Sequence, residues 1–302
     1  YVPDDNFEQA LINLGCDNVL DDYVLTAAID TLTYLYVGGQ NIANLTGIED
    51  FTALTQLGCS GNQLTSLDVS QNAALTSLHC TYNQLTSLDV SGATALTYLI
   101  CEDNQLTSLD VSNNTALTNL DCHENQLTSL DVSNNTALTN LDCHENQLTS
   151  LDVSANTALT YLYFSYNQLT SIDLSQNTVW RLSCANNQLT SLDVSNNTYL
   201  THLWCSGNQL TSLDVRNGNN NLLDTNFYCT NNPNLSCINV DNFTWSTANW
   251  TNIDPQHYFS NNCSATSIQE HKTTKELLKV TDLLGRETKQ TNQPLFYIYD
   301  DG

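Results

Sequence analysis

The chain of 302 residues is strongly acidic, because 32 acidic side chains against seven basic ones give a formal net charge of −25. Clustered Lys and Arg supply much of the affinity of proteins for nucleic acids and anionic membranes, so this composition argues against a nucleic-acid-binding protein. No apolar stretch approaches the roughly 18 residues needed to cross a bilayer, and we expect no membrane span. The absence of Met fits a mature protein that begins at Tyr1 after removal of a secretory signal peptide.

Residues 1–31 have the pattern of an N-terminal cap. The segment FEQALINLG follows two aspartates, ends on a glycine, and has apolar residues at helical spacing: Phe7, Ala10, Leu11 and Leu14. Acidic residues at the start and glycine at the end are typical helix boundaries. We predict a helix here that covers the first end of the structure that follows.

Residues 32–235 repeat the motif LxxLxCxxNxL. Its asparagine recurs every 21 residues, and then with small insertions and deletions, at Asn62, Asn83, Asn104, Asn125, Asn146, Asn167, Asn187, Asn208 and Asn232. This pattern resembles the leucine-rich repeat family, in which each coil supplies a short parallel strand and the coils stack. The resemblance implies an α/β repeat solenoid of about ten coils. We expect the Leu and Cys positions to point inward and the Asn to bond the backbone of neighbouring coils.

Most of the 11 cysteines belong to the repeat. Eight of them hold the same inward position: Cys59, Cys80, Cys101, Cys122, Cys143, Cys184, Cys205 and Cys229. They are predicted to act as small core hydrophobes, because the local spacing typical of zinc or iron–sulfur sites is missing.

Residues 236–265 depart from the repeat and are predicted to form a C-terminal cap. They gain Trp245 and Trp250 and carry Cys237 and Cys263 near their two ends. We predict a disulfide between these two cysteines, which would suit an oxidising compartment.

The charge balance changes near the end of the chain. Residues 1–271 hold 27 acidic and two basic side chains, whereas residues 272–302 hold five of each. We interpret residues 266–274 as a linker and residues 275–302 as a small β unit, in which apolar and polar residues alternate.

The tail contains an LLGRE segment and, further on, the strand-like segment LFYIY. It resembles the C-terminal sorting domain of cargo of the type IX secretion system of Bacteroidetes. That resemblance rests on Leu283, Leu284, Gly285, Arg286 and Tyr297, and it lacks the further basic strand of the family pattern. It implies recognition by the type IX translocon and export to the cell surface or medium. The alternative is an accessory β-hairpin with no sorting role.

One face of the solenoid, expected to be concave, carries the differences between otherwise similar coils. It is predicted to bind a surface protein or a glycan through Tyr34, Tyr36, His79, Tyr82, Tyr98, Tyr161, Tyr163, Tyr166, Arg181, His202, Trp204 and Tyr228. Exposed aromatic rings dominate recognition hot spots and stack on sugars. The alternative is that these tyrosines merely suit strands, which they favour.

Two copies of the segment DCHEN suggest a metal site. Asp121 and His123 share a face, and Asp142 and His144 repeat them one coil later, so these four side chains could converge on a divalent cation. The second copy is a duplicate, however, and the segment lacks the second histidine of a zinc helix of the HExxH type.

The opposite face carries one aspartate per coil: Asp68, Asp89, Asp110, Asp131, Asp152, Asp173, Asp193 and Asp214. Repulsion along this row calls for compensation, either by hydrogen bonds from the serines two residues earlier, such as Ser66 and Ser87, or by bound calcium. A parallel row of threonines resembles ice-binding solenoids, but the adjacent aspartates disfavour that function.

The sequence contains no nucleophile elbow, phosphate-binding loop or isolated catalytic triad, so we predict no enzymatic activity and no required cofactor. The prediction is a secreted or cell-surface leucine-rich repeat protein that binds a ligand on its variable face. The alternative is a structural or adhesive surface component stabilised by calcium or by assembly.

Overall fold

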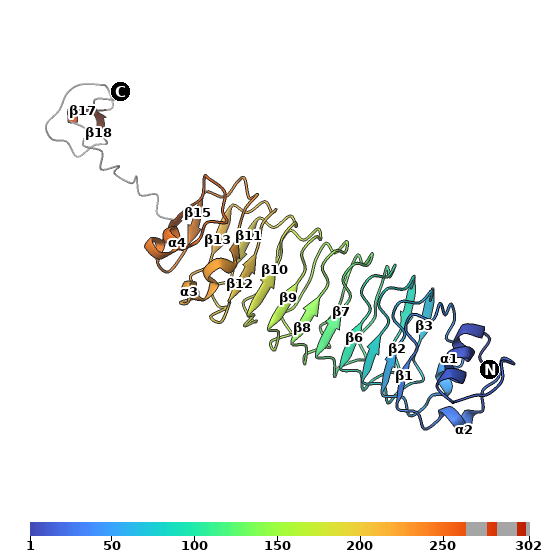
Figure 1. The fold of residues 1–302 in the computed structure, drawn as a ribbon. Helices are drawn as coiled ribbons and strands as arrows, with labels where there is room; N and C mark the ends of the chain where they lie inside the picture. The colour runs from blue at the N-terminus through green and yellow to red at the C-terminus, as the bar shows by residue number, and fades with distance from the viewer. Residues whose placement is uncertain (264–276, 283–294, 300–302) are drawn as a thin grey trace. The chain divides into compact units, whose positions relative to one another are not determined.

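In the computed structural model, short parallel strands from successive coils pair to form a solenoid (Figure 1). The structure describes residues 1–263, 277–282 and 295–299. Contacts divide the chain into two units, Tyr1–Cys263 and Ser264–Gly302. The solenoid and its caps lie within the first unit.

Ten strands, one from each coil, form the main sheet. They are β1 (Tyr34–Tyr36), β2 (Gln56–Gly58), β4 (Ser77–His79), β6 (Tyr98–Ile100), β7 (Asn119–Asp121), β8 (Asn140–Asp142), β9 (Tyr161–Tyr163), β10 (Arg181–Ser183), β12 (His202–Trp204) and β14 (Phe227–Tyr228). Equivalent residues lie side by side, so Leu99 pairs with Leu120 and Leu120 with Leu141. The predicted leucine-rich repeat solenoid of about ten coils is confirmed.

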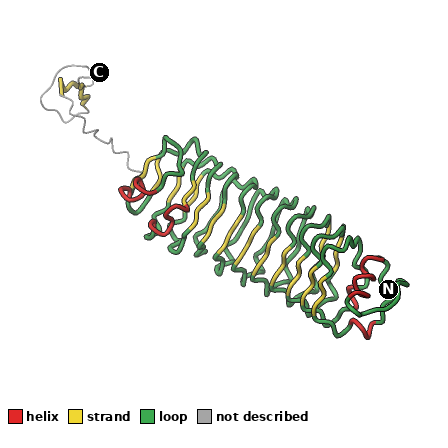
Figure 2. Tube along the Cα trace, viewed as in Figure 1, coloured by secondary structure: helices red, strands yellow, loops and turns green. Residues whose placement is uncertain are grey.

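A second set of strands runs along the opposite side of the coils (Figure 2). It comprises β3 (Ser66–Asp68) paired with β5 (Ser87–Asp89), and a sheet of β11 (Ser191–Asp193), β13 (Ser212–Asp214), β15 (Cys237–Asn239) and β16 (Tyr258–Ser260). In β3, Leu67 is buried while Ser66 and Asp68 are exposed, which is the alternation that a strand requires. Several coils therefore contain two strands, where the repeat pattern predicts one.

The repeated asparagine connects each coil to the one before it. The Nδ2 atom of Asn125 donates to the carbonyl oxygens of Cys101 and Cys122 at 3.1 and 3.2 Å. Its Oδ1 accepts from the backbone N–H of Leu106 at 2.9 Å. One buried amide thus satisfies polar backbone groups of two coils, as the sequence predicts, and the eight repeated cysteines beside these asparagines are fully buried.

A second row of buried asparagines has the same period and lies on the other side of the coil. Asn135, for example, donates from Nδ2 to the carbonyl oxygens of Val111 and Asn114, both at 2.9 Å. The row was not predicted, although its recurrence is visible in the sequence: Asn72, Asn114, Asn135, Asn156, Asn177 and Asn197.

The predicted N-terminal helix is α1 (Asp5–Asn13), and its first turn is capped by the carboxylate of Asp4. Phe7 and Leu11 are buried against the first coil, where the ring of Phe7 stacks on Phe51 at 6.3 Å between centroids. The helix ends before Leu14, the last apolar residue of the helical pattern, and leaves it 53% exposed. Two short helices follow, α2 (Thr26–Ile29) and the 3₁₀ helix η1 (Ile48–Asp50).

A buried carboxylate holds the cap loop in place. Glu8 is completely buried and accepts from the backbone N–H groups of Asp21, Asp22 and Tyr23 at 3.0 to 3.1 Å. Several N–H donors on one carboxylate compensate for the loss of its hydration.

The C-terminal cap extends the solenoid although its sequence departs from the repeat. The cap strands β15 and β16 continue the second set, and the last coil and cap contain the short helices α3 (Asn220–Leu223), η2 (Asp224–Asn226) and α4 (Phe243–Asn249). Trp250 closes the core, stacked on Phe227 at 4.2 Å and edge-on to Phe259 at 5.6 Å.

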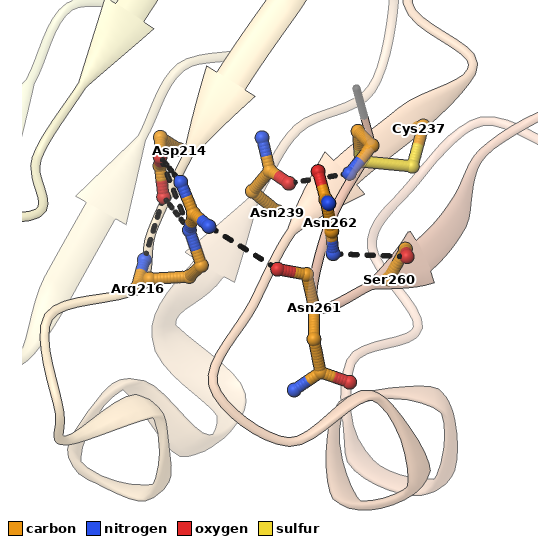
Figure 3. Close-up of a disulfide and its surroundings, with 8 residues drawn as sticks. Asp214, Arg216, Cys237, Asn239, Ser260, Asn261 and Asn262 are labelled. Carbon is orange, nitrogen blue, oxygen red and sulfur yellow. Dashed lines mark hydrogen bonds and ion pairs between the residues drawn. A yellow bond between two sulfur atoms is a disulfide. The ribbon is translucent and has the colours of Figure 1, made fainter. Parts of the chain in front are cut away.

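The predicted disulfide between Cys237 and Cys263 is present, and hydrogen bonds surround it (Figure 3). The backbone N–H of Cys263 donates to Oδ1 of Asn239 at 2.7 Å. Nearby, Arg216 pairs with Asp214 and donates from Nη1 to the carbonyl of Asn261 at 3.2 Å. These bonds fasten the last described residues of the cap to β13 and β15.

In the second unit, β17 (Leu277–Asp282) and β18 (Leu295–Tyr299) pair antiparallel, with Val280 opposite Tyr297. The other residues of the proposed sorting motif, 283–286, and the predicted linker 266–274 lie outside the described residues.

The aspartate row is compensated by hydrogen bonds, but not from the predicted serines. Each aspartate accepts from the residue two positions later, as when Oδ1 of Asp131 accepts from the backbone N–H of Ser133 at 2.9 Å. The hydroxyl and the backbone N–H of Ser133 lower the pKa of Asp131, and five aspartates share such a lowering. The partner lies after the aspartate because the chain turns there, so the serine before it is left outside the turn.

Replacing Asn125 by Ala should lower the free energy of unfolding by about 2 to 3 kcal/mol, because it leaves buried backbone groups of two coils without partners. Urea unfolding followed by circular dichroism measures the change. Asn113→Ala is the matched control, since Asn113 is exposed and donates only to the carbonyl of Ser91, and it should stay within about 0.5 kcal/mol of the parent. Equal losses in the two variants would contradict this role for Asn125.

Acid should destabilise the solenoid through the aspartate row. A carboxyl whose pKa is lower in the folded protein contributes stability above its unfolded pKa of about 3.9, and this stability is lost as the pH falls through the folded pKa. The triple variant Asp110→Asn, Asp131→Asn, Asp152→Asn keeps an acceptor at each turn but cannot titrate. Its urea midpoint should therefore fall less steeply below about pH 4 than that of the parent. Parallel pH profiles would refute this contribution.

Candidate functional site

The outer surface of the ten-stranded sheet, together with the two residues after each Cys position, is called here the main-sheet face. It is the face predicted to be concave. The twelve residues predicted to bind a ligand lie on it. Tyr82 and Tyr166 follow strands, and the others lie within them: Tyr34, Tyr36, His79, Tyr98, Tyr161, Tyr163, Arg181, His202, Trp204 and Tyr228.

The amino acids at equivalent positions differ more from coil to coil on one side of the solenoid than on the other. On the opposite side the string LTSLDVS recurs unchanged, at 106–112, 127–133 and 148–154 among other places. On the main-sheet face, neighbouring coils carry tyrosine, histidine, carboxylate, arginine or tryptophan at equivalent places. Both sides share one backbone geometry, so the variation is not required by the fold.

The second residue after each Cys position adopts a left-handed backbone conformation. Glycine occupies it in three coils, Gly39, Gly61 and Gly207, whereas seven coils place a side chain there with φ between 50° and 57°: Tyr82, Asp103, Glu124, Glu145, Tyr166, Asn186 and Asn231. This conformation costs most residues about 1 to 2 kcal/mol, and Asn and Gly tolerate it best. Tyr and Glu at this place are therefore kept despite a local cost, which is typical of functional positions.

An aromatic region covers β9 to β12. Arg181 lies 5.5 Å from the centroid of the Tyr161 ring, and Trp204 lies 6.4 Å from Tyr163 and 5.2 Å from His202. Burial and the charge of Arg181 lower the pKa of His202. Arg181 and Arg216 are the two basic side chains of residues 1–271, and Arg216 is paired with Asp214. Arg181 therefore presents a cation on this face.

A hollow of about 390 Å³ lies near the N-terminal end of the face, between Tyr36 and His79. Its floor includes Gly58, where an added Cβ would lie 2.6 Å from the ring of Tyr36. The hydroxyl of Tyr36 hydrogen-bonds Oε1 of Gln56 at 2.6 Å. The glycine thus allows the ring to lie across the neighbouring strand, a role that the sequence prediction missed.

The centre of the face holds the two predicted His–Asp pairs. Nδ1 of His123 lies 2.6 Å from Oδ1 of Asp121, and His144 and Asp142 have the same separation. The two imidazole rings stack, with centroids 4.2 Å apart and planes 13° from parallel. The structure therefore brings together all four predicted metal-site residues.

Carboxylates surround this centre and set its protonation. Burial lowers the pKa of His123, but the hydrogen bond to Asp121 and the charges of surrounding carboxylates outweigh it and raise the pKa to about 9. The hydrogen bond to Asp142 likewise raises the pKa of His144. Glu102, which lies 3.3 Å from Nδ1 of His123, was not among the predicted site residues. Glu102 and His123 each follow the Cys of their coil directly, and this shared repeat position in adjacent coils could have predicted their contact.

The fold and this face define a leucine-rich repeat solenoid protein. No protein-family model matches the chain. Internalin J of Listeria monocytogenes serotype 4b is 46% identical over 72 residues, which are 24% of this chain and 8% of that protein. The solved functional domain of internalin J from Listeria monocytogenes, which includes a cysteine ladder, is 39% identical with a TM-score of 0.58, over 80% of this chain and 56% of that one.

A solved leucine-rich repeat protein of Leptospira interrogans has a TM-score of 0.60 at 21% identity, over 78% of this chain and 67% of that chain, and shows the fold alone. The chain is a leucine-rich repeat protein related to internalin J. It spans just over half of the solved internalin J domain and a small part of the whole protein. Across the described ranges, no helix is long and apolar enough to cross a membrane.

Replacing Tyr166 by Asn should leave the free energy of unfolding unchanged or raise it by up to about 1 kcal/mol, because Asn tolerates the left-handed conformation better. The Tyr166 side chain is 55% exposed, so little packing is lost. Urea unfolding measures the effect. The reverse change, Asn186→Tyr, should destabilise by a similar amount. A loss of more than about 1 kcal/mol in Tyr166→Asn would show that this tyrosine is structural.

Proposed function

We propose that the protein is a secreted or cell-surface binding protein that holds a protein ligand on its main-sheet face. The observation that carries the proposal is that side chains vary along this face while the opposite face repeats with few changes. A long open surface with separate aromatic and acidic regions suits a protein partner, which can contact many coils at once. A glycan that stacks on the tyrosines is the other outcome of the test below.

The aromatic region is the expected hot spot of this interface. Tyr, Trp and Arg are the residues that contribute most to protein association, because they bury large areas with little loss of rotamer entropy. Tyr161, Tyr163 and Trp204 are each partly buried by their neighbours, which pre-organises their rings. Arg181 and the acidic centre would orient the partner, since complementary charge fixes register and speeds encounter.

The fold is one that serves binding rather than catalysis in known leucine-rich repeat proteins, and we propose no reaction for this chain. Export by the type IX secretion system remains part of the proposal. It is supported by the resemblance of the tail, by the pairing of β17 with β18, and by the disulfide, which suits an oxidising compartment.

The triple variant Tyr161→Ala, Tyr163→Ala, Trp204→Ala should lose at least about 2 kcal/mol of binding free energy, roughly a 30-fold loss of affinity. The parent protein is first used as bait to capture a partner from a mixture of surface proteins. A glycan array is probed with the parent protein in parallel. The affinity of each variant for that partner is then measured by surface plasmon resonance.

The matched control also removes two tyrosines and a tryptophan: Tyr23→Ala, Trp180→Ala and Tyr199→Ala. These rings are 47 to 64% exposed but lie outside the strands of the main sheet. The control should bind like the parent. If the main-sheet variant binds as tightly as the control, the proposed interface is wrong. Binding to the glycan array alone would assign the face to a carbohydrate.

A further inference from the structure

We propose that the centre of the main-sheet face binds a divalent transition-metal cation such as Zn²⁺, with His123, His144 and Glu124 as ligands. One ligand atom from each of these three side chains lies within 4.8 Å of the other two. Two imidazoles and a carboxylate are a ligand set that Zn²⁺ favours. This assignment differs from the sequence prediction, in which Asp121 and Asp142 share the metal with the histidines.

Asp121 and Asp142 hold the histidine rings in place and are not ligands of the cation in this proposal. Each accepts a hydrogen bond from Nδ1 of its own histidine at 2.6 Å. An Nδ1–H held in this way makes Nε2 the nitrogen that ligates, and a cation that binds there displaces the Nε2 proton. A carboxylate behind a ligating histidine orients the ring and makes it more basic. The same arrangement occurs in two adjacent coils, so both rings are oriented in the same way.

The histidines are held near each other without being locked. Their rings stack at 4.2 Å, and their side chains keep exposed fractions of 17% and 27%. Zn–N bonds of about 2.0 to 2.1 Å require the two lone pairs to converge. The two partly exposed rings would therefore turn out of this parallel stack when the cation binds.

The local charge favours a dication at this place. Glu102, Asp103, Glu124 and Glu145 surround the two His–Asp pairs on the same face. Like charges gathered in one place repel one another, and a bound dication would relieve the repulsion.

The backbone conformation of Glu124 suits this role. Glu124 and Glu145 hold the left-handed position of their coils at φ 50°, where glycine would fit at no cost. In this conformation Glu124 is brought within reach of both histidines. Binding of a cation by the Glu124 carboxylate would account for a strained backbone at this position.

The repeated cysteines of the solenoid do not compete for the cation. The repeated cysteines are fully buried, and burial raises the pKa of Cys59 to about 12, so these thiols are neither accessible nor ionised. Three protein ligands leave one position of a tetrahedral zinc open. A water molecule or a donor from a bound partner would fill that position, but metal uptake itself does not depend on the proposed partner.

The test is isothermal titration of the whole chain with ZnCl₂ in an excess of CaCl₂, which saturates sites made of carboxylates alone. The parent should bind one Zn²⁺, and the variant His123→Gln/His144→Gln should lose this binding. His79→Gln is the matched control, since it removes an exposed histidine of the same face two coils away, and it should bind like the parent. Circular dichroism confirms that each variant is folded.

Two further measurements separate the parts of the proposal. The variant Asp121→Asn/Asp142→Asn should weaken Zn²⁺ binding by about 10- to 100-fold, as expected for residues that support metal ligands, and Glu124→Gln should weaken it while the histidines remain. The ¹⁵N resonances of both imidazoles should shift at Nε2 when Zn²⁺ is added. No binding by the parent, or undiminished binding by the double histidine variant, would overturn the proposal.

Discussion

The structure depends on the amide of one repeated asparagine. Successive coils turn too tightly for their backbones to satisfy themselves, and each asparagine supplies donors to the carbonyl oxygens of two coils and an acceptor to the coil before. Because the bonds cross between coils, each coil is stable only beside its neighbours. The buried Leu and Cys positions provide the apolar area, but the asparagines fix the 21-residue register that aligns all other side chains.

That register has a consequence for function. With identical backbones in every coil, a side chain on the main-sheet face always lies beside the equivalent side chain of the next coil. A duplicated segment therefore becomes a pair of stacked side chains, as for His123 and His144. The same geometry produces the row of aspartates on the other face. There each carboxylate is satisfied within its own turn, whereas at the centre of the main-sheet face Glu102 contacts His123 of the next coil.

Stability and recognition oppose each other on this surface. The left-handed position after each Cys is easiest for glycine or asparagine, yet several coils place tyrosine or glutamate there. The core is regular enough to tolerate these local costs, since the free energy of stacking is distributed over ten coils. Residues such as Tyr82 and Glu124 are thus free to serve binding without endangering the fold.

The sequence by itself determined the repeat, its phase, the inward Leu and Cys positions, the capping helix and the Cys237–Cys263 disulfide. Each of these follows from local pattern, because the same chemistry recurs at a fixed interval or at a chain boundary. It also identified which face varies. It misplaced the partners of the aspartates, since these depend on how the backbone turns after each strand.

Only the tertiary structure decided which variable side chains touch. Side chains from different coils come together only when the coils are stacked, so Glu102 beside His123, Tyr36 across Gly58 and Arg181 over Tyr161 could not be read from spacing within one coil. The structure also gave the aspartates of the two DCHEN segments their place behind the histidines, because hydrogen-bond direction depends on side-chain rotamers that a repeat pattern does not specify.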